Sequence, residues 1–150
     1  MPTLAENKRV YFDYEVLEKY EAGLVLSGPE VKSAKGGRVD LRGSYVNIDK
    51  NRQVWLINLH IAPYPPAFGI QKNYSPNQNR KLLFKKKEII SLLVKLQQKG
   101  LTALPLKVYT KNGFIKVEIG LVKGRKKWNK KELIKKREVD KRIKQSLREH

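Results

Sequence analysis

The segment TALPLKVYTKNGFIKVEIGLV, residues 102–122, contains two runs in which apolar and polar side chains alternate. A period of two predicts β-strands at 102–110 and 114–122, because successive side chains of a strand point to opposite faces of the sheet. Asn112-Gly113, between the runs, is typical of a tight turn. This segment therefore predicts an antiparallel hairpin, and the rest of the chain indicates what packs around it.

Three further stretches have the pattern of strands. Apolar residues alternate from residue 10 to residue 26, a run too long for one flat strand, so we expect it to bend at Gly23 and count it as two strands. Runs at 44–48 and 53–61, separated by the turn-like residues 49–52, predict a second hairpin. Hairpin-connected short strands favour a closed barrel, which leaves no sheet edge exposed. The predicted fold is mainly β with flanking helices, a six-stranded antiparallel barrel.

Two helices are expected beside the strands. Ser27 can cap a short helix, with Glu30 at the capping-box position and a Gly-Gly pair at its end. Apolar residues in 85–99 recur at the spacing of one helix face, and Gly100 ends that helix. The proline-rich stretch 62–80 has no sustained period, so we predict a long functional loop there.

The charge of the chain points to a polyanion as partner. The formal net charge is +19 and the isoelectric point is near 10.1. The last 28 residues, 123–150, hold 13 Lys or Arg and four Asp or Glu. Nucleic acid is the first candidate for such a distribution. We predict an RNA-binding barrel domain at 1–122 and a basic tail at 123–150 that is disordered when free and helical when bound.

The composition argues against several other kinds of protein. The chain has no Cys and only two His, which excludes disulfides, thiolate catalysis and Cys zinc sites. His60 is expected on the polar side of its strand, and the capping role is expected for Glu30 rather than catalysis. We therefore expect no enzyme activity, cofactor or metal. No stretch approaches the roughly 20 apolar residues of a membrane span, so the expected location is the cytoplasm.

Two basic clusters are candidate RNA-binding sites. Arg80-Lys81 and 85–87 flank Leu82-Leu83-Phe84, which places cations for phosphates beside apolar side chains for ribose or bases. The alternative is a solvated helix start with both leucines in the core. Residues 123–131 surround Trp128, whose indole either stacks on a base or docks onto the barrel.

Seven segments, in order along the chain, resemble the small protein B (SmpB) family, the SsrA-binding proteins. They are YEAG (20–23), GPEVKS (28–33), SYV (44–46), IAPY (61–64), RKLL (80–83), PLKVY (105–109) and KVEIGLVKG (116–124). The resemblance runs from about Asn7 to the end of the chain, and it is specific because no single motif has to carry it.

The resemblance implies a bacterial trans-translation factor. Its barrel would be similar to an OB-fold and would bind the tRNA-like domain of tmRNA, delivering it to stalled ribosomes together with an elongation factor. The tail would become helical in the empty mRNA channel, near the decoding centre of the small subunit. We expect a monomer. The alternative is a structural ribosomal or nucleoid-associated basic protein, and sequencing the co-purifying RNA discriminates the two.

The resemblance also implies site residues. The expected RNA-binding residues are Asn7, Glu21, Lys32, Arg80, Lys81, Leu83, Lys123 and Lys126. The expected ribosome contacts of the tail are Trp128, Lys130, Lys131 and Ile143. The chain departs from the family pattern at Pro29, Ala34-Lys35, Gln78, Asn129 and Lys131.

Overall fold

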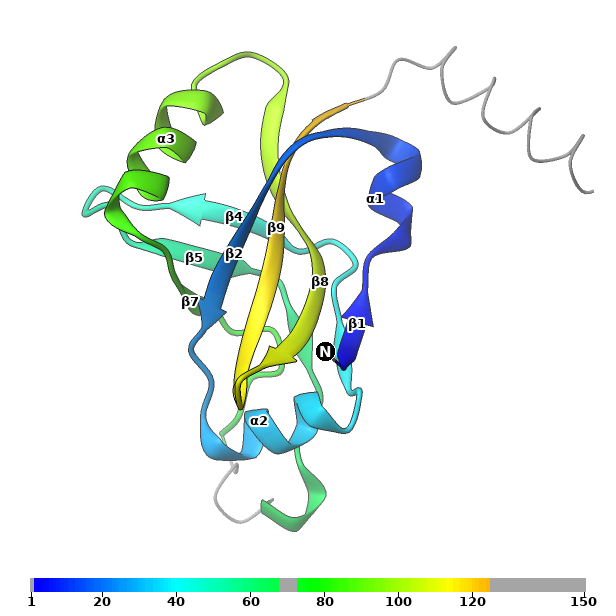
Figure 1. Ribbon diagram of the computed structural model, residues 1–150. Helices are drawn as coiled ribbons and strands as arrows, with labels where there is room; N and C mark the ends of the chain where they lie inside the picture. Colours follow the sequence, from blue (N-terminus) through cyan, green and yellow to red (C-terminus); the bar gives the residue numbers. More distant parts are fainter. Residues whose placement is uncertain (1, 68–72, 125–150) are drawn as a thin grey trace, which may run out of the picture.

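The computed structural model describes residues 2–67 and 73–124 (Figure 1). Its elements are β1 (Thr3–Glu6), α1 (Lys8–Asp13), β2 (Tyr14–Leu24), α2 (Gly28–Lys35), β3 (Val39–Asp40), β4 (Tyr45–Ile48), β5 (Val54–Ile57), β6 (His60–Ile61), the 3₁₀ helix η1 (Pro65–Ala67), β7 (Arg80–Leu83), α3 (Lys86–Leu96), β8 (Leu101–Lys111) and β9 (Phe114–Gly124). Within the described ranges, no helix is long and apolar enough to cross a membrane.

Seven strands form one antiparallel sheet in the order β1-β8-β9-β2-β7-β5-β4, and β3 pairs with β6 separately. The sheet curls until β4 contacts β8, although these two strands are not paired by hydrogen bonds (Figure 1). The predicted mainly β, antiparallel fold with flanking helices is confirmed. The expected number of six strands is wrong, because the described residues form nine strands. The strands β1, β3 and β7, which were not predicted, have four residues or fewer, and runs this short do not establish a pattern of apolar residues.

Both predicted hairpins are present. β8 and β9 pair from Leu101↔Lys123 to Lys111↔Phe114, and the turn between them has φ of 52° at Asn112 and 80° at Gly113. This left-handed backbone at both residues is the reason that Asn-Gly is favoured there. β4 and β5 form the other hairpin.

The first predicted strand begins later than the alternation suggested. Residues 10–13 belong to α1, in which Arg9 and Asp13 form an ion pair of 3.2 Å, and β2 begins at Tyr14. Val10 and Phe12 are both buried, so this short helix is covered on more than one side. Two buried positions with an exposed one between them look the same in a sequence whether they lie in a strand or in one helical turn.

The bend expected at Gly23 is not the irregular point of β2. The register of β2 against β9 shifts between Val16 and Glu18, whereas Gly23 pairs regularly with Lys116. The last strand also extends further than expected, because β9 ends at Gly124 and not at residue 122. Lys123 therefore lies in the sheet.

The two predicted helices are confirmed. The Ser27 hydroxyl accepts a hydrogen bond from the Glu30 N–H, and the Glu30 carboxylate accepts one from the Ser27 N–H at 3.1 Å, so the capping box of α2 is complete. α3 ends at Leu96, shortly before Gly100 with its φ of 85°.

Side chains from both faces of the sheet form cores. The main core lies inside the curled sheet, and a second, smaller core of Val10, Leu106 and Val122 lies where α1 covers its outer side. Gly120 supports this second core because it leaves room for Leu106, whose Cδ1 lies 2.9 Å from the position that a Cβ on Gly120 would take.

We expect Gly120→Ala to lower the free energy of unfolding by about 1–3 kcal/mol, because the added methyl group overpacks the second core. Denaturation in urea measures the loss. Gly28→Ala is the matched control, since no neighbouring atom lies within 4 Å of its Cβ position. Equal stability of the two variants would contradict this account of Gly120.

Candidate nucleic-acid interface

Four lysines gather on the outer side of the neighbouring strands β2, β9 and β8. We call this surface the lysine face and define it by Lys19, Glu21, Lys107, Tyr109, Lys111, Lys116 and Glu118. Residues that alternate with them, Ala22, Val108 and Val117, are buried in the main core. The period of two in three adjacent strands therefore produces one polar, mainly cationic surface.

The two carboxylates of the lysine face hold its cations in place. Glu118 lies 3.5 Å from the Nζ atoms of both Lys19 and Lys107, so one negative charge is shared by two lysines. Each ammonium has three donors, so after the contact with Glu118, and for Lys19 a second contact with Tyr11, each still has a donor for a further acceptor. The two lysines and Glu118 together carry a net positive charge.

Glu21, on β2 opposite Glu118, binds side chains of β8 in the same way as Glu118 does. It accepts a hydrogen bond from the Tyr109 hydroxyl and contacts Lys111 Nζ at 3.3 Å. The Tyr109 hydrogen bond, followed by that from Lys111, lowers the pKa of Glu21 below its usual value, while burial and Glu21 raise the pKa of Tyr109. Glu21 is therefore ionised and fixes the side chains of β8 beside β2.

Three residues expected from the resemblance lie on or beside this surface. Glu21 is part of it, and Leu83 lies next to it, paired with Gly23 and 55% exposed. Asn7 precedes α1 and lines a groove that Lys19, Lys107 and Glu118 also line. Segments separated by more than 70 residues in the sequence thus meet at one site.

The other expected residues lie elsewhere. Lys81 is on the same side of β7 as Leu83 and is partly exposed. Lys32 is exposed on α2, and Lys123 is exposed near the end of β9, where it pairs with Glu15 and Leu101. His60 is exposed, as expected, and its Nδ1 lies 2.7 Å from the Asn77 side-chain oxygen. Lys126, Trp128, Lys130, Lys131 and Ile143 fall outside the described residues.

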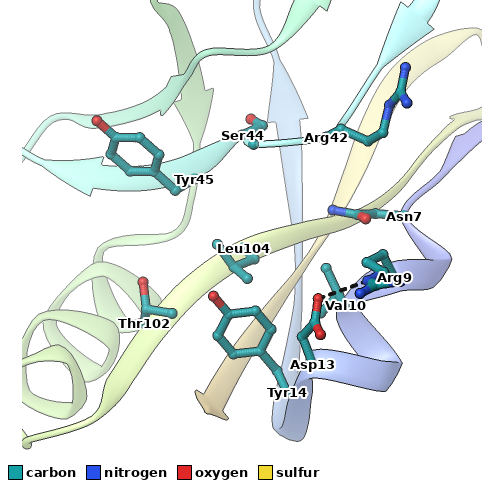
Figure 2. Close-up of a pocket in the computed structure, with 11 residues that line it drawn as sticks. Asn7, Arg9, Val10, Asp13, Tyr14, Arg42, Ser44, Tyr45, Thr102 and Leu104 are labelled. Atoms are coloured by element: carbon teal, nitrogen blue, oxygen red, sulfur yellow. Dashed lines mark hydrogen bonds and ion pairs between the residues drawn. The ribbon is translucent and has the colours of Figure 1, made fainter. Parts of the chain in front are cut away.

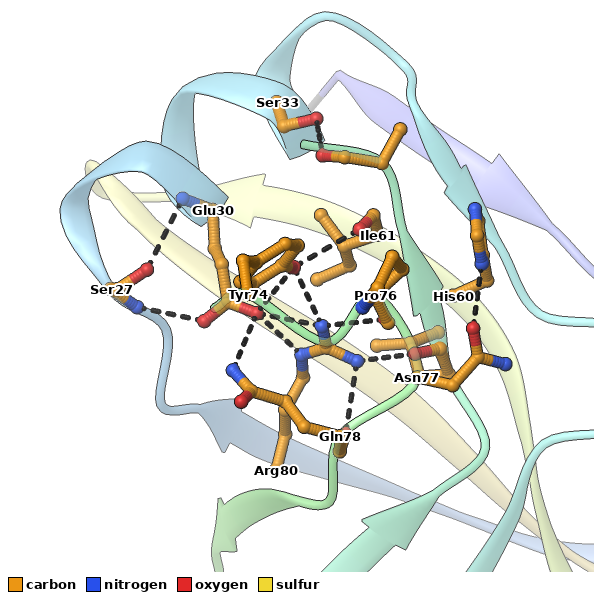
Figure 3. Close-up of polar contacts among 12 residues, drawn as sticks. Ser27, Glu30, Ser33, His60, Ile61, Tyr74, Pro76, Asn77, Gln78 and Arg80 are labelled. Atoms are coloured by element: carbon orange, nitrogen blue, oxygen red, sulfur yellow. Dashed lines mark hydrogen bonds and ion pairs between the residues drawn. The ribbon is translucent and has the colours of Figure 1, made fainter. Parts of the chain in front are cut away.

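Arg80 does not lie on the surface, which corrects its assignment as a phosphate contact. Its side chain is 2% exposed, and its Nε donates to Glu30 Oε2 at 2.7 Å (Figure 3). Its remaining donors bind the Tyr74 hydroxyl and the carbonyl oxygens of Leu59, Pro76 and Gln78. The alternation of β7 explains the difference, since Arg80 and Leu82 point inward and Lys81 and Leu83 point outward.

The surroundings of Glu30 favour its charged form. Burial raises the pKa of Glu30, but the hydrogen bond from the Ser27 N–H and the guanidinium of Arg80 outweigh burial and lower it below the usual value. Tyr74 donates its hydroxyl to Glu30 at 2.9 Å, and burial together with this bond raises the pKa of Tyr74 to about 12. Glu30 and Arg80 therefore join α2 to β7, and their contacts with Tyr74, Pro76 and Gln78 fix the segment that precedes β7.

None of the four lysines of the lysine face was among the site residues expected from the sequence. Lys107, Lys111 and Lys116 occupy alternate positions in the predicted hairpin, which was the available signal. Lys19 and Glu21 join them only because β2 pairs with β9, a contact between residues about 100 positions apart.

The chain is similar to proteins of one family over nearly its whole length. The model of the family described as "SmpB protein" matches residues 4–149. The SsrA-binding protein of Carboxydothermus hydrogenoformans is 48% identical over 145 residues, 97% of this chain and 95% of that protein. The SsrA-binding protein of Persephonella marina is 49% identical over 140 residues, 93% of this chain and 90% of that protein.

A solved structure agrees with these relatives. It is described as "tmRNA-SmpB: a journey to the center of the bacterial ribosome", and its matching chain is 44% identical with a TM-score of 0.67. The match covers 87% of this chain and 93% of that chain. Because sequence and fold agree over nearly the whole length, this chain belongs to the SmpB family.

Proposed function

We propose that this protein binds tmRNA, the SsrA RNA, and delivers its tRNA-like domain to stalled bacterial ribosomes. Family membership supports this function, and the observation that carries it is the meeting of Asn7, Glu21 and Leu83 at the lysine face. Work on the ribosome would place the protein in the cytoplasm. In this proposal the protein is a monomer that binds RNA without catalysing a reaction. An elongation factor takes part in the delivery of tmRNA to the ribosome.

The lysine face suits the backbone of folded RNA. Its lysines neutralise phosphates, and the carboxylates of Glu21 and Glu118 keep the ammonium groups at set positions, so that the spacing of phosphates is recognised rather than charge alone. Helical RNA is recognised mainly by such shape and phosphate contacts. The exposed Leu83 adds apolar surface beside the cations, suited to a ribose or an unstacked base.

Binding to the tRNA-like domain is expected to depend steeply on salt, because neutralised phosphates release counterions. Lys116→Gln should lower the affinity and reduce the slope of log K against log salt by about 1. Filter binding at several salt concentrations measures both quantities. Lys50→Gln, at an exposed position in the turn between β4 and β5, is the control that should leave the slope unchanged. An equal slope for wild type and Lys116→Gln would refute the assignment of Lys116.

The alternative of a structural ribosomal or nucleoid-associated protein is tested by the RNA that co-purifies. A delivery factor should carry one discrete structured RNA, whereas the alternative predicts mixed ribosomal RNA and DNA. Sequencing the bound nucleic acid distinguishes the two outcomes directly.

A further inference from the structure

A second site lies where the curled sheet stays open. An open pocket of about 610 Å³ is lined by α1, by residues 42–45 and by the start of β8 (Figure 2). Here β4 approaches β8 without hydrogen-bonding to it. The volume is in the range of small-molecule pockets. Asn7 lines both this pocket and the groove beside Lys107, so the pocket adjoins the lysine face.

The pocket offers aromatic and apolar surface. Tyr14 and Leu104 pack with the second core on one side and line the pocket on the other. Tyr45, which is 46% exposed, lines it from the start of β4. In Figure 2, Leu104 lies between the two tyrosines. Tyrosine rings at such a site provide faces on which a flat heterocycle can stack.

The pocket also contains polar groups without partners. Among the described residues, no partner accepts from or donates to the hydroxyl of Tyr14 or Tyr45. Asn7 is 8% exposed, and its side-chain nitrogen donates to the Pro105 carbonyl at 3.4 Å. Its side-chain oxygen accepts no hydrogen bond from any of the described residues. A buried amide oxygen that lacks a donor is costly, so a partner is expected to supply one.

The charges at the rim do not favour a bare phosphate. Arg9 is paired with Asp13 at 3.2 Å, and Arg42 is paired with Asp40 at 2.8 Å. Each arginine is therefore balanced by a neighbouring carboxylate. Ring surface and unpaired hydrogen-bonding groups, rather than net positive charge, are the features of this pocket.

We propose that this pocket receives one unpaired base of the RNA that lies on the lysine face, stacked on Tyr14 or Tyr45 and hydrogen-bonded by the Asn7 side chain. The inference rests on the proposed function for the source of the base, but the pocket itself can be tested with a free nucleoside. Stacking is tolerant of base identity, so adenosine is a suitable probe.

The first experiment follows the tyrosine ring signals of the full-length protein by NMR during titration with adenosine, adenosine 5′-monophosphate or inorganic phosphate. Adenosine and its monophosphate should shift the Tyr14 and Tyr45 signals in a saturable way, and phosphate alone should not. Tyr45→Ala should weaken the shift of Tyr14, whereas Phe114→Ala, an exposed ring at the other end of β9, should leave it intact. Phosphate shifting the two rings as strongly as adenosine, or no saturable response to adenosine, would overturn the proposal.

The second experiment uses the tRNA-like domain of tmRNA. Tyr45→Ala should weaken its binding roughly tenfold, the effect of one stacked base, and Tyr45→Phe should restore most of the affinity because the ring remains. An affinity for Tyr45→Ala equal to that of Phe114→Ala would overturn the role of the pocket in RNA binding. Failure of the wild-type protein to bind this RNA would instead refute the proposed function. The adenosine titration would then still test whether the pocket binds a base.

Discussion

Arg80→Leu should lower the free energy of unfolding by about 3–5 kcal/mol, because it leaves the charge of Glu30 buried without its partner. Arg80 and Glu30 are 2% and 3% exposed, and the guanidinium also binds the carbonyl oxygens of residues 59, 76 and 78. Removing it unpairs several acceptors at once. Thermal and urea unfolding measure the loss.

The neighbouring residue provides a matched control. Lys81→Leu removes a cation one position along β7 on the outer side of the sheet, where a charge is solvated, and should cost less than about 1 kcal/mol. The double variant Arg80→Leu with Glu30→Leu should recover part of the stability, because apolar side chains then replace both charges. A loss for Arg80→Leu no larger than for Lys81→Leu would mean that the buried pair does not hold α2 and β7 together.

The same pair predicts a dependence on pH. The pKa of Glu30 in the folded protein is below its ordinary value of 4.5, so its contribution to stability is present above that value and is lost as pH falls through the folded pKa. The stability difference between the wild type and Glu30→Gln should therefore be largest near neutral pH and shrink below pH 4.5. A difference that grows as the pH falls would contradict an ionised Glu30.

Cutting the chain after Gly124 should abolish tagging on stalled ribosomes while leaving specific binding to the tRNA-like domain largely unchanged. The last strand ends at Gly124, paired with Tyr14, so the cut preserves the sheet and the lysine face. The residues removed carry 12 of the 33 Lys and Arg, which we expect to serve the ribosomal channel.

Two assays in parallel test this division of roles: filter binding at moderate salt and tagging in a reconstituted translation reaction. Circular dichroism shows whether the truncated protein remains folded. Trp128→Ala in the full-length chain is the finer variant, which should keep tmRNA affinity and lower tagging. Equal loss of binding and tagging in the truncated protein would place the tail in the tmRNA site and refute the division.

Local chemistry was enough to predict most elements. The Asn112-Gly113 turn, the capping box of Ser27 and Glu30, and the apolar face of α3 each depend on residues close together in the sequence, and all three are confirmed. The assignment of residues 10–13 to a strand is wrong, because one turn of helix buried on several sides has the same pattern of apolar residues as a strand.

The sequence by itself determined the fold class and the strong positive charge. Its resemblance to the SmpB family also indicated Glu21 and Leu83 as RNA-binding residues. Only the tertiary structure decided what these residues contact. The pairing of β2 with β9 brings Glu21 near Tyr109 and Lys111, and the alternation of β7 turns Arg80 inward to Glu30 while Lys81 faces outward. The physical reason is that strand periodicity is local, whereas the choice of neighbouring strands, and hence of the surface they form, depends on how distant segments pack.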